Sequence, residues 1–380
     1  MRLLVLDQFS DLGGAQQCLL DLLPAMRQRG WQVLVGLPGD GAMFERVKAE
    51  GFEARRIPCG PYRSGRKSAF DAGRWVAQLP RLALEIRRMA AEIAADRVLL
   101  NGPRLVPAAA AARLRCPVVF HAHSSVPPGV TQRLVGTALR AMDARLIGAC
   151  RFVADPWRRY VPPQCIAVIY NGVPGPDRLG GQATRLPAAS AIGCIGRIAP
   201  EKGQREFLAA AAAIAHAIRG CRFLIYGAAL FSDKRAQQYE REVRAAAAGL
   251  PVEFMGWAPE PYAALATLDL LLVPSAAQEA TPRVIMEAFA AGVPVIARAS
   301  GGVPEIVQHG RTGLLAGPPA EMAQFAIELL NGDPDRRAAI VRAARESWRA
   351  NYTVERYRLE ATNALENGAL AFLPVHNLQQ

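Results

Sequence analysis

Apolar runs of strand length alternate with amphipathic segments of helical length along nearly the whole chain. The first pair is the run LLVLD at 3–7 and the segment 13–30, and further runs include WQVLVGLP, DRVLLNG and PVVFHAHSS. Buried strands that alternate with helices form a parallel sheet with helices on its faces. The alternation restarts after 174–187, whose proline and glycine content is typical of a linker. We therefore expect an α/β protein with domains at 1–173 and 188–350.

Length, cysteines and apolar runs restrict the class of protein. A chain of 380 residues can form two domains that each bury a core. The seven cysteines are well spread and form no C-x-x-C pair, which fits small core residues in a reducing compartment. No signal peptide is visible, and apolar runs such as 207–218 are shorter than the ~20 residues of a membrane span. We expect a cytoplasmic protein.

The net charge of +12 is concentrated in the first half of the chain. Residues 1–185 contain 26 Lys and Arg against 14 Asp and Glu, whereas residues 186–380 contain 19 of each. This excess favours an anionic surface as partner of the first half, and general solubility charge is the alternative. We expect peripheral association with the inner face of the cell membrane and no nucleic-acid binding. The arginines proposed to face anionic headgroups are Arg63, Arg66, Arg87, Arg88, Arg133, Arg140, Arg158 and Arg159.

Two glutamates separated by seven residues, Glu279 and Glu287, stand in the stretch Ser275–Gly313. Between them, Thr281 and Pro282 favour a helix start, with the threonine as N-cap and the proline as first helical residue. The free backbone N–H groups of a helix start suit a phosphate. The stretch therefore offers hydroxyl acceptors at both ends of an anion site, which is the layout that a nucleotide sugar needs. Two surface charges are the alternative interpretation.

The same stretch resembles the Glu-(seven residues)-Glu signature of the retaining glycosyltransferases of family 4. The strand AGVPVIA and the double glycine Gly301-Gly302 follow in the family's order. The resemblance implies the GT-B architecture, in which two Rossmann-like domains face each other across a cleft. A closing helix within 351–380 would then cross back to the first domain.

The resemblance also implies roles in donor binding. Glu287 would hold the ribose hydroxyls of a nucleotide sugar, and Glu279 would hold the sugar hydroxyls. Where the family often has Glu-Gly-Phe, this chain has Glu279, Ala280 and Thr281, and alanine narrows the backbone conformations open to this loop. The remaining donor contacts implied in this stretch come from Ala280, Thr281, Arg283, Gly301 and Gly302.

A basic pair follows the first strand of the second half. In SAIGCIGRIAPEKG, Arg197 follows Gly196, and Lys202 stands five residues later, before an alanine-rich helix. By resemblance, Arg197 and Lys202 match the pair that clamps the donor diphosphate. Such cations neutralise the leaving group as the glycosidic bond breaks, the role that metal ions fill elsewhere. We expect no cofactor and no metal, and ordinary surface charge is the alternative.

A glycine pair, Gly13-Gly14, follows the first strand and opens a helix that closes at Gly30. Glycine lets the backbone approach a ligand closely, with helix amides behind it. The pair is not the G-x-G-x-x-G of dinucleotide folds. By resemblance this loop approaches the donor diphosphate, and a plain tight turn is the alternative.

Two histidines, His121 and His123, end an apolar strand, which is where ligands bind in open α/β sheets. They should point to the same side because they are two residues apart. A metal site would need further ligands, and none is indicated nearby. By resemblance His123 faces the donor sugar, with Ser124 following it. His121, Ser124 and Arg63, the last from the basic loop 59–68, are assigned to the acceptor side.

Asp333-Pro334-Asp335 matches the Asp-x-Asp pattern that binds metal in the other large glycosyltransferase architecture. It follows Asn331-Gly332 and precedes RRAAIVRAAR, so we interpret Asp333 and Pro334 as the start of a helix at 334–350.

The sequence as a whole indicates a retaining, metal-independent glycosyltransferase. It would move a sugar from a nucleoside-diphosphate sugar to a lipid-linked or envelope-glycan acceptor. Its expected catalytic residues are Arg197, Lys202, Glu279 and His123. Two alternatives stay open: a nucleotide-sugar epimerase of the same architecture, and a non-catalytic protein that binds a nucleotide sugar.

Overall fold

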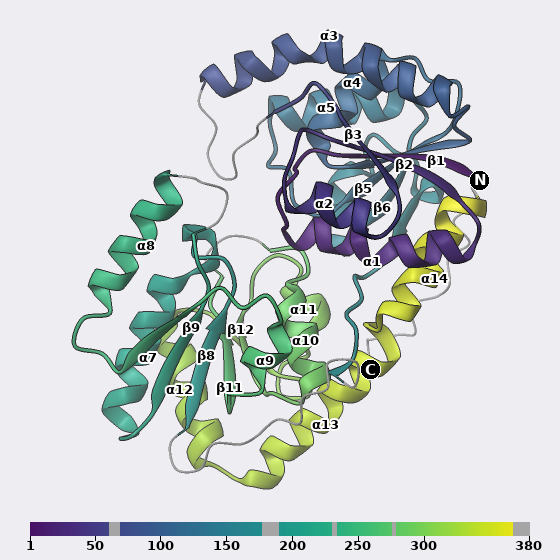
Figure 1. Ribbon diagram of the computed structural model, residues 1–380. Helices are drawn as coiled ribbons and strands as arrows, with labels where there is room; N and C mark the ends of the chain where they lie inside the picture. The colour runs from purple at the N-terminus through teal and green to yellow at the C-terminus, as the bar shows by residue number, and fades with distance from the viewer. Residues whose placement is uncertain (61–68, 177–189, 230–233, 276–278, 368–380) are drawn as a thin grey trace. The chain divides into compact units, whose positions relative to one another are not determined.

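A computed structural model describes residues 1–60, 69–176, 190–229, 234–275 and 279–367 (Figure 1). The chain divides into two compact units. Unit 1 comprises Met1–Asn171 and Arg356–Gln380, and unit 2 comprises Gly172–Glu355. Most of the expected linker at 174–187 lies outside the described residues. Within the described parts of the chain, no helix has the length and apolar character needed to cross a bilayer.

Unit 1 is built on a seven-stranded sheet in which every neighbouring pair is parallel. The strand order is β3-β2-β1-β4-β5-β6-β7. The central strands are almost fully buried, as the apolar runs predict. The strands are β1 (Arg2–Asp7), β2 (Gln32–Leu37), β3 (Glu53–Arg56), β4 (Arg97–Asn101), β5 (Val118–Ala122), β6 (Arg145–Gly148) and β7 (Ile166–Val168).

Helices cover both faces of the unit 1 sheet (Figure 1). On one face, α1, α2 and the C-terminal helix α14 share an apolar core with β1 and β2. On the other face, α4 packs between α3 and α5. The helices of unit 1 are α1 (Gly14–Gln28), α2 (Ala42–Ala49), α3 (Ala69–Glu92), α4 (Val106–Ala111), α5 (Val130–Ala141), α6 (Arg151–Ala154) and α14 (Val354–Asn367).

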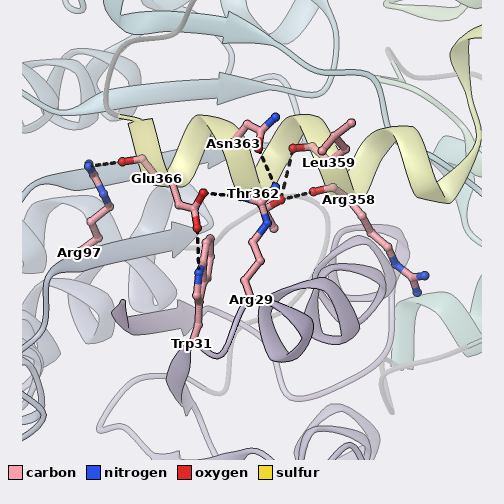
Figure 2. A network of polar contacts seen from close by, with 8 residues as sticks. All are labelled: Arg29, Trp31, Arg97, Arg358, Leu359, Thr362, Asn363 and Glu366. Carbon is pink, nitrogen blue, oxygen red and sulfur yellow. Dashed lines mark hydrogen bonds and ion pairs between the residues drawn. The ribbon is translucent and has the colours of Figure 1, made fainter.

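Helix α14 returns the chain to unit 1, which confirms the expected crossing back. Tyr357, Ala361 and Leu365 enter the core that α1 forms with the sheet. Polar contacts fix the end of the helix (Figure 2). Glu366 pairs with Arg29, accepts a hydrogen bond from Trp31 Nε1 at 3.1 Å, and through its backbone carbonyl accepts one from Arg97 at 2.8 Å.

Unit 2 is built on a six-stranded sheet, again with every neighbouring pair parallel, in the order β10-β9-β8-β11-β12-β13. Its core includes Phe207 and Phe223, whose rings meet edge to face at 6.2 Å. The strands are β8 (Ala191–Ile195), β9 (Arg222–Tyr226), β10 (Val252–Gly256), β11 (Leu270–Val273), β12 (Val295–Arg298) and β13 (Leu314–Ala316). The helices are α7 (Gln204–Ala217), α8 (Lys234–Ala246), α9 (Pro261–Leu265), α10 (Arg283–Ala291), α11 (Val303–Ile306), α12 (Pro319–Asn331) and α13 (Pro334–Asn351).

Both sheets reverse their strand order at one point, between β1 and β4 in unit 1 and between β8 and β11 in unit 2. In open α/β sheets, ligands bind outside the carboxyl ends of the strands at such a switch point. The glycine pair follows β1, and the basic pair follows β8. The topology therefore places both predicted motifs where a ligand site is expected in each unit.

Candidate functional site

The loop after β8 carries the basic pair in a constrained backbone. Gly196 has φ 149° and donates its N–H to Tyr226 O at 2.9 Å. A side chain on the neighbouring Gly227 would bring its Cβ to 2.1 Å from the Gly196 carbonyl oxygen, so only glycine fits there. Lys202 ends a short 3-10 helix, and Gly203, at φ 75°, turns the chain into α7.

Gln204 is a buried residue that sequence reasoning missed. Its side-chain amide donates to the Arg197 carbonyl at 2.9 Å, and its Oε1 accepts from the Ala199 N–H at 3.3 Å. The side chain thereby ties the start of α7 to the loop that carries Arg197. The only signal in the sequence is a glutamine directly after Lys-Gly at the start of a helix, which is weak by itself.

One member of the basic pair, Lys202, meets the first glutamate, Glu279, although the two are 77 residues apart. Lys202 Nζ lies 2.6 Å from Glu279 Oε1, and the two side chains are 30% and 18% exposed. Ser275 Oγ donates to the same carboxylate oxygen at 3.1 Å. Arg197 pairs with Glu201 at 2.6 Å. Both cations are thus held beside carboxylates at the carboxyl ends of β8 and β11.

The double glycine packs directly against the backbone of Glu279. The Gly302 N–H donates to the Glu279 carbonyl oxygen at 2.8 Å. At Gly301, which has φ 59°, a Cβ would lie 2.1 Å from that same oxygen. Glycine is therefore required here for both its backbone conformation and its small size. The loop after β12 fixes the position of the loop that carries Glu279.

Helix α10 begins at Arg283, one residue later than predicted, and the assignment of Thr281 as its N-cap is wrong. Pro282 is the N-cap instead, because its ψ of 114° lies outside the helical range, while its carbonyl accepts the first helical hydrogen bond from Ile285 at 3.1 Å. No side chain caps this end. Thr281 and Ala280 are buried in the preceding loop.

Glu287 lies more than one turn inside α10, as predicted, and it is almost fully buried. Arg283 stands one turn earlier, with its Nε 3.6 Å from Glu287 Oε1, and also donates to the Gly172 carbonyl at 3.1 Å. A buried carboxylate needs such a partner, since an isolated charge is costly away from water.

In unit 1, the glycine pair starts α1 as predicted. Gly13 is the N-cap and Gly14 the first helical residue. No side chain caps this helix end, and a Cβ on Gly14 would meet no atom within 4 Å. The first amides of α1 therefore have no side-chain acceptor from the cap, and the space beside Gly14 is open.

A buried carboxylate at the end of β1 anchors this helix start. Asp7 accepts hydrogen bonds from Gln16 Nε2 at 2.9 Å, from the Phe9 N–H at 2.9 Å and from Asn101 Nδ2. These contacts join β1, the first turn of α1 and β4 at the switch point. Burial raises the pKa of Asp7 to about 6, although the hydrogen bonds that it accepts oppose this shift.

The two histidines lie together, as their spacing predicts. The rings of His121 and His123 have centroids 3.8 Å apart. His121 is buried. Burial is the main cause that lowers its pKa well below the ordinary value, and the nearby His123 adds to this effect. Ser124 is exposed, and Arg63 lies outside the described residues.

Asp333 caps α13, as predicted, accepting a hydrogen bond from the Asp335 N–H at 2.9 Å, with Pro334 as first helical residue. Among the described residues, no group of three or more His, Cys, Asp or Glu is placed to hold a metal ion.

Comparison with known proteins identifies the family. Residues 12–174 match the family described as Glycosyltransferase Family 4, and residues 189–332 match Glycosyl transferases group 1. The chain belongs to the family 4 glycosyltransferases. This glycosyltransferase is 28% identical over 363 residues to a phosphatidyl-myo-inositol mannosyltransferase of Mycobacterium leprae, with 90% of each chain covered.

A second relative is the D-inositol 3-phosphate glycosyltransferase of Segniliparus rotundus. It is 32% identical over 290 residues, which are 68% of this chain and 64% of the relative. The alignment thus spans less than two thirds of that protein. Among solved structures, Anabaena HepE in complex with UDP-glucose has a TM-score of 0.79 at 25% identity, covering 96% of this chain and 99% of the other. The glycosyltransferase has the GT-B fold, as expected.

Proposed function

We propose that this glycosyltransferase is a retaining, metal-independent enzyme that uses a nucleoside-diphosphate sugar as donor. The observation that carries the proposal is the 2.6 Å pair between Lys202 and Glu279 at the switch point of unit 2. It brings the cation assigned to the diphosphate to the carboxylate assigned to the sugar. The bond that breaks in the reaction joins the sugar to the diphosphate. Its cleavage requires groups that bind the sugar and the diphosphate side by side.

Each side chain of the site has a role in this proposal. Arg197 and Lys202 bind the diphosphate, and Lys202 exchanges its carboxylate partner for a phosphate oxygen when the donor arrives. Glu279, released from the pair, accepts hydrogen bonds from the sugar hydroxyls, and Glu287 accepts those of the ribose. Backbone N–H groups beside Gly14, at the start of α1, add hydrogen-bond donors to the diphosphate and transfer no proton themselves.

The proposed reaction is a front-face displacement. The acceptor hydroxyl forms a bond to the anomeric carbon on the face from which the diphosphate leaves, and the bond between that carbon and the leaving oxygen breaks. The leaving phosphate oxygen takes the acceptor's proton. Arg197 and Lys202 stabilise the negative charge that grows on the diphosphate, so no metal ion is required. We assign His123 to the sugar side of this step.

The proposed acceptor is lipid-linked and contains inositol or a related polyol. The names of two relatives, a phosphatidyl-myo-inositol mannosyltransferase and a D-inositol 3-phosphate glycosyltransferase, support this class. The positive charge of the first half supports work at an anionic membrane surface, on its cytoplasmic side.

A donor screen tests the proposal. The full chain is incubated with UDP-glucose or GDP-mannose, with and without phosphatidylinositol, and the products are analysed by NMR. Transfer with retained anomeric configuration supports the proposal. Free sugar without acceptor dependence would assign the chain to the epimerase class, and tight donor binding without turnover would make it a binding protein.

A further inference from the structure

Unit 1 contains a pocket at the amino ends of strands β6 and β7, whereas the glycine pair follows the carboxyl end of β1. It has a volume of about 240 Å³ and lies between the end of α5 and the segment 158–162. Helix α5 ends just before β6 begins, and 158–162 leads into β7, so the pocket lies at the amino ends of these strands. The glycine pair follows the carboxyl end of β1, and the two histidines lie at the carboxyl end of β5. The pocket is therefore separate from the proposed active site.

Tyr160 lines this pocket and packs closely against α5. A Cβ on Gly136 would lie 2.3 Å from the Tyr160 ring, so this glycine lets the ring pack against the helix backbone. The buried Trp157 supports the ring from another side, with centroids 6.4 Å apart. The guanidinium groups of Arg140 and Arg159 lie 5.9 and 5.7 Å from the centre of this one ring.

The pocket has an excess of positive charge. Arg140, Arg158 and Arg159 line it, and Asp143 is the one carboxylate among its lining residues. Arg158 already pairs with Asp155 at 2.7 Å. Within the described chain, neither Arg140 nor Arg159 forms an ion pair, and Arg140 donates to the Arg159 carbonyl instead. Both guanidinium groups lie against the ring of Tyr160, so an anion bound in the pocket would be attracted by both positive charges.

We propose that this pocket, named here the Tyr160 pocket, binds a phosphate group. Guanidinium forks match the geometry of phosphate oxygens and form charge-assisted hydrogen bonds with them. The volume is below the roughly 300–1,000 Å³ of typical small-molecule sites, which fits a compact group rather than a whole nucleotide.

The exposed surface of α5, the helix whose end lines the pocket, indicates a lipid as the source of this phosphate. On α5, Val130 and Leu134 are 83% and 41% exposed and stand one turn apart, with the exposed Arg133 beside them. The helix contains no acidic residue. Exposed apolar side chains next to arginines fit the boundary between headgroups and acyl chains. A soluble phosphorylated compound is the other source of the same chemistry.

The test compares two variants of the full chain with equal charge. In the pocket variant, Arg140→Gln is combined with Arg159→Gln. In the control variant, Arg113→Gln is combined with Arg115→Gln, because both of these arginines are exposed in unit 1 and lie outside the pocket lining. Thermal unfolding checks that each variant folds. Binding is then measured to phosphatidylglycerol vesicles by sedimentation and to inorganic phosphate by calorimetry.

Weaker binding to the vesicles by about tenfold in the pocket variant alone would assign the site to a lipid phosphate. Unchanged vesicle binding with loss of inorganic phosphate binding in that variant would assign it to a soluble phosphate. If the pocket and control variants behave alike in both assays, the proposal is wrong. Neither assay requires sugar transfer, so the result is independent of the proposed reaction.

Discussion

At the scale of single residues, the proposed site contains positive charges that are already paired with carboxylates of the protein. Lys202 pairs with Glu279, and Arg197 pairs with Glu201. A diphosphate must therefore compete with two carboxylates, and it offers more negative charge than either. This arrangement favours doubly charged ligands over single anions such as chloride or acetate.

Lys202→Ala and Arg197→Ala should each lower kcat/KM at least about tenfold, because one charge-assisted contact to a developing oxyanion is worth ~1.5–3 kcal/mol. Steady-state kinetics with the donor found in the screen measure the effect. Lys48→Ala, a change of an exposed lysine on α2, serves as control. Near-normal kinetics in both folded site variants would refute the assignment of the basic pair.

Gly301→Ala should destabilise unit 2 and reduce activity, because the new methyl group meets the Glu279 carbonyl. Gly310→Ala is the matched control, since Gly310 also has a left-handed backbone (φ 77°) but has open space around the position of a Cβ. Gly310→Ala should lower the free energy of unfolding by about 1–2 kcal/mol, from backbone strain alone. Urea unfolding of both variants measures the difference, and equal losses would show that the contact with Glu279 is unimportant.

Asp7→Asn should change how stability depends on pH. The pKa of Asp7 in the folded protein is raised to about 6 from an ordinary value of 3.8, so the folded state holds this proton more tightly than the unfolded chain. Protonated Asp7 therefore stabilises the folded state fully below pH 4, and this stabilisation is lost as the pH rises to about 6. The shift corresponds to about 3 kcal/mol.

Chemical unfolding at pH 4 and pH 7 tests this expectation. The wild type should lose free energy of unfolding between pH 4 and pH 7 because of Asp7, and the asparagine variant should not show this loss. The stability of the variant relative to the wild type should therefore be higher at pH 7 than at pH 4. The same difference between the two proteins at both pH values would contradict the assignment.

At the scale of elements, the sequence predicted the alternation of strands and helices but not which elements lie side by side in the folded chain. Helix α13 matches the predicted 334–350 to within one residue, because Asp333 and Pro334 mark a helix start by local chemistry alone. The start of α10 was misplaced because a Thr-Pro pair fits the N-cap and the first helical position by residue type, whereas here Pro282 itself has a non-helical backbone. Only the observed ψ of Pro282 decides between them.

Contacts between distant elements could not be read from spacing. The meeting of Lys202 with Glu279 depends on β11 lying beside β8, and the contact of Asp7 with Asn101 depends on β4 lying beside β1. Strand order is a property of the assembled sheet, and local residue patterns do not encode it. Gln204 escaped notice for the same reason, since its partners are backbone groups of a folded loop.

The docking of α14 can be tested with two leucines on this one helix. Leu365 is fully buried in the core of unit 1, whereas Leu359 is 56% exposed. Leu365→Ala should cost about 2–5 kcal/mol from lost burial and the cavity left behind. Leu359→Ala should change stability by no more than about 0.5 kcal/mol. Thermal unfolding of both variants measures this, and similar effects would contradict the observed burial.

At the scale of the whole molecule, catalysis should continue after metal removal. Arg197 and Lys202 supply the positive charge that a metal ion would otherwise bring to the diphosphate. An assay with excess chelator should retain almost all activity. Complete loss that magnesium or manganese restores would instead revive a metal site that includes Asp333 and Asp335.

The return of α14 to unit 1 has a consequence for how the protein is made. A ribosome releases Met1–Asn171 long before Arg356 emerges, yet Tyr357, Ala361 and Leu365 complete the apolar core of that unit. Unit 2 is contiguous in sequence and can reach its full set of internal contacts while the last helix is still being synthesised. Until α14 has been synthesised, the core of unit 1 is incomplete and the face of α1 that packs against α14 is uncovered. The half of the chain that is translated first is therefore the half that matures last, and this interval is when chaperones have an apolar surface to bind.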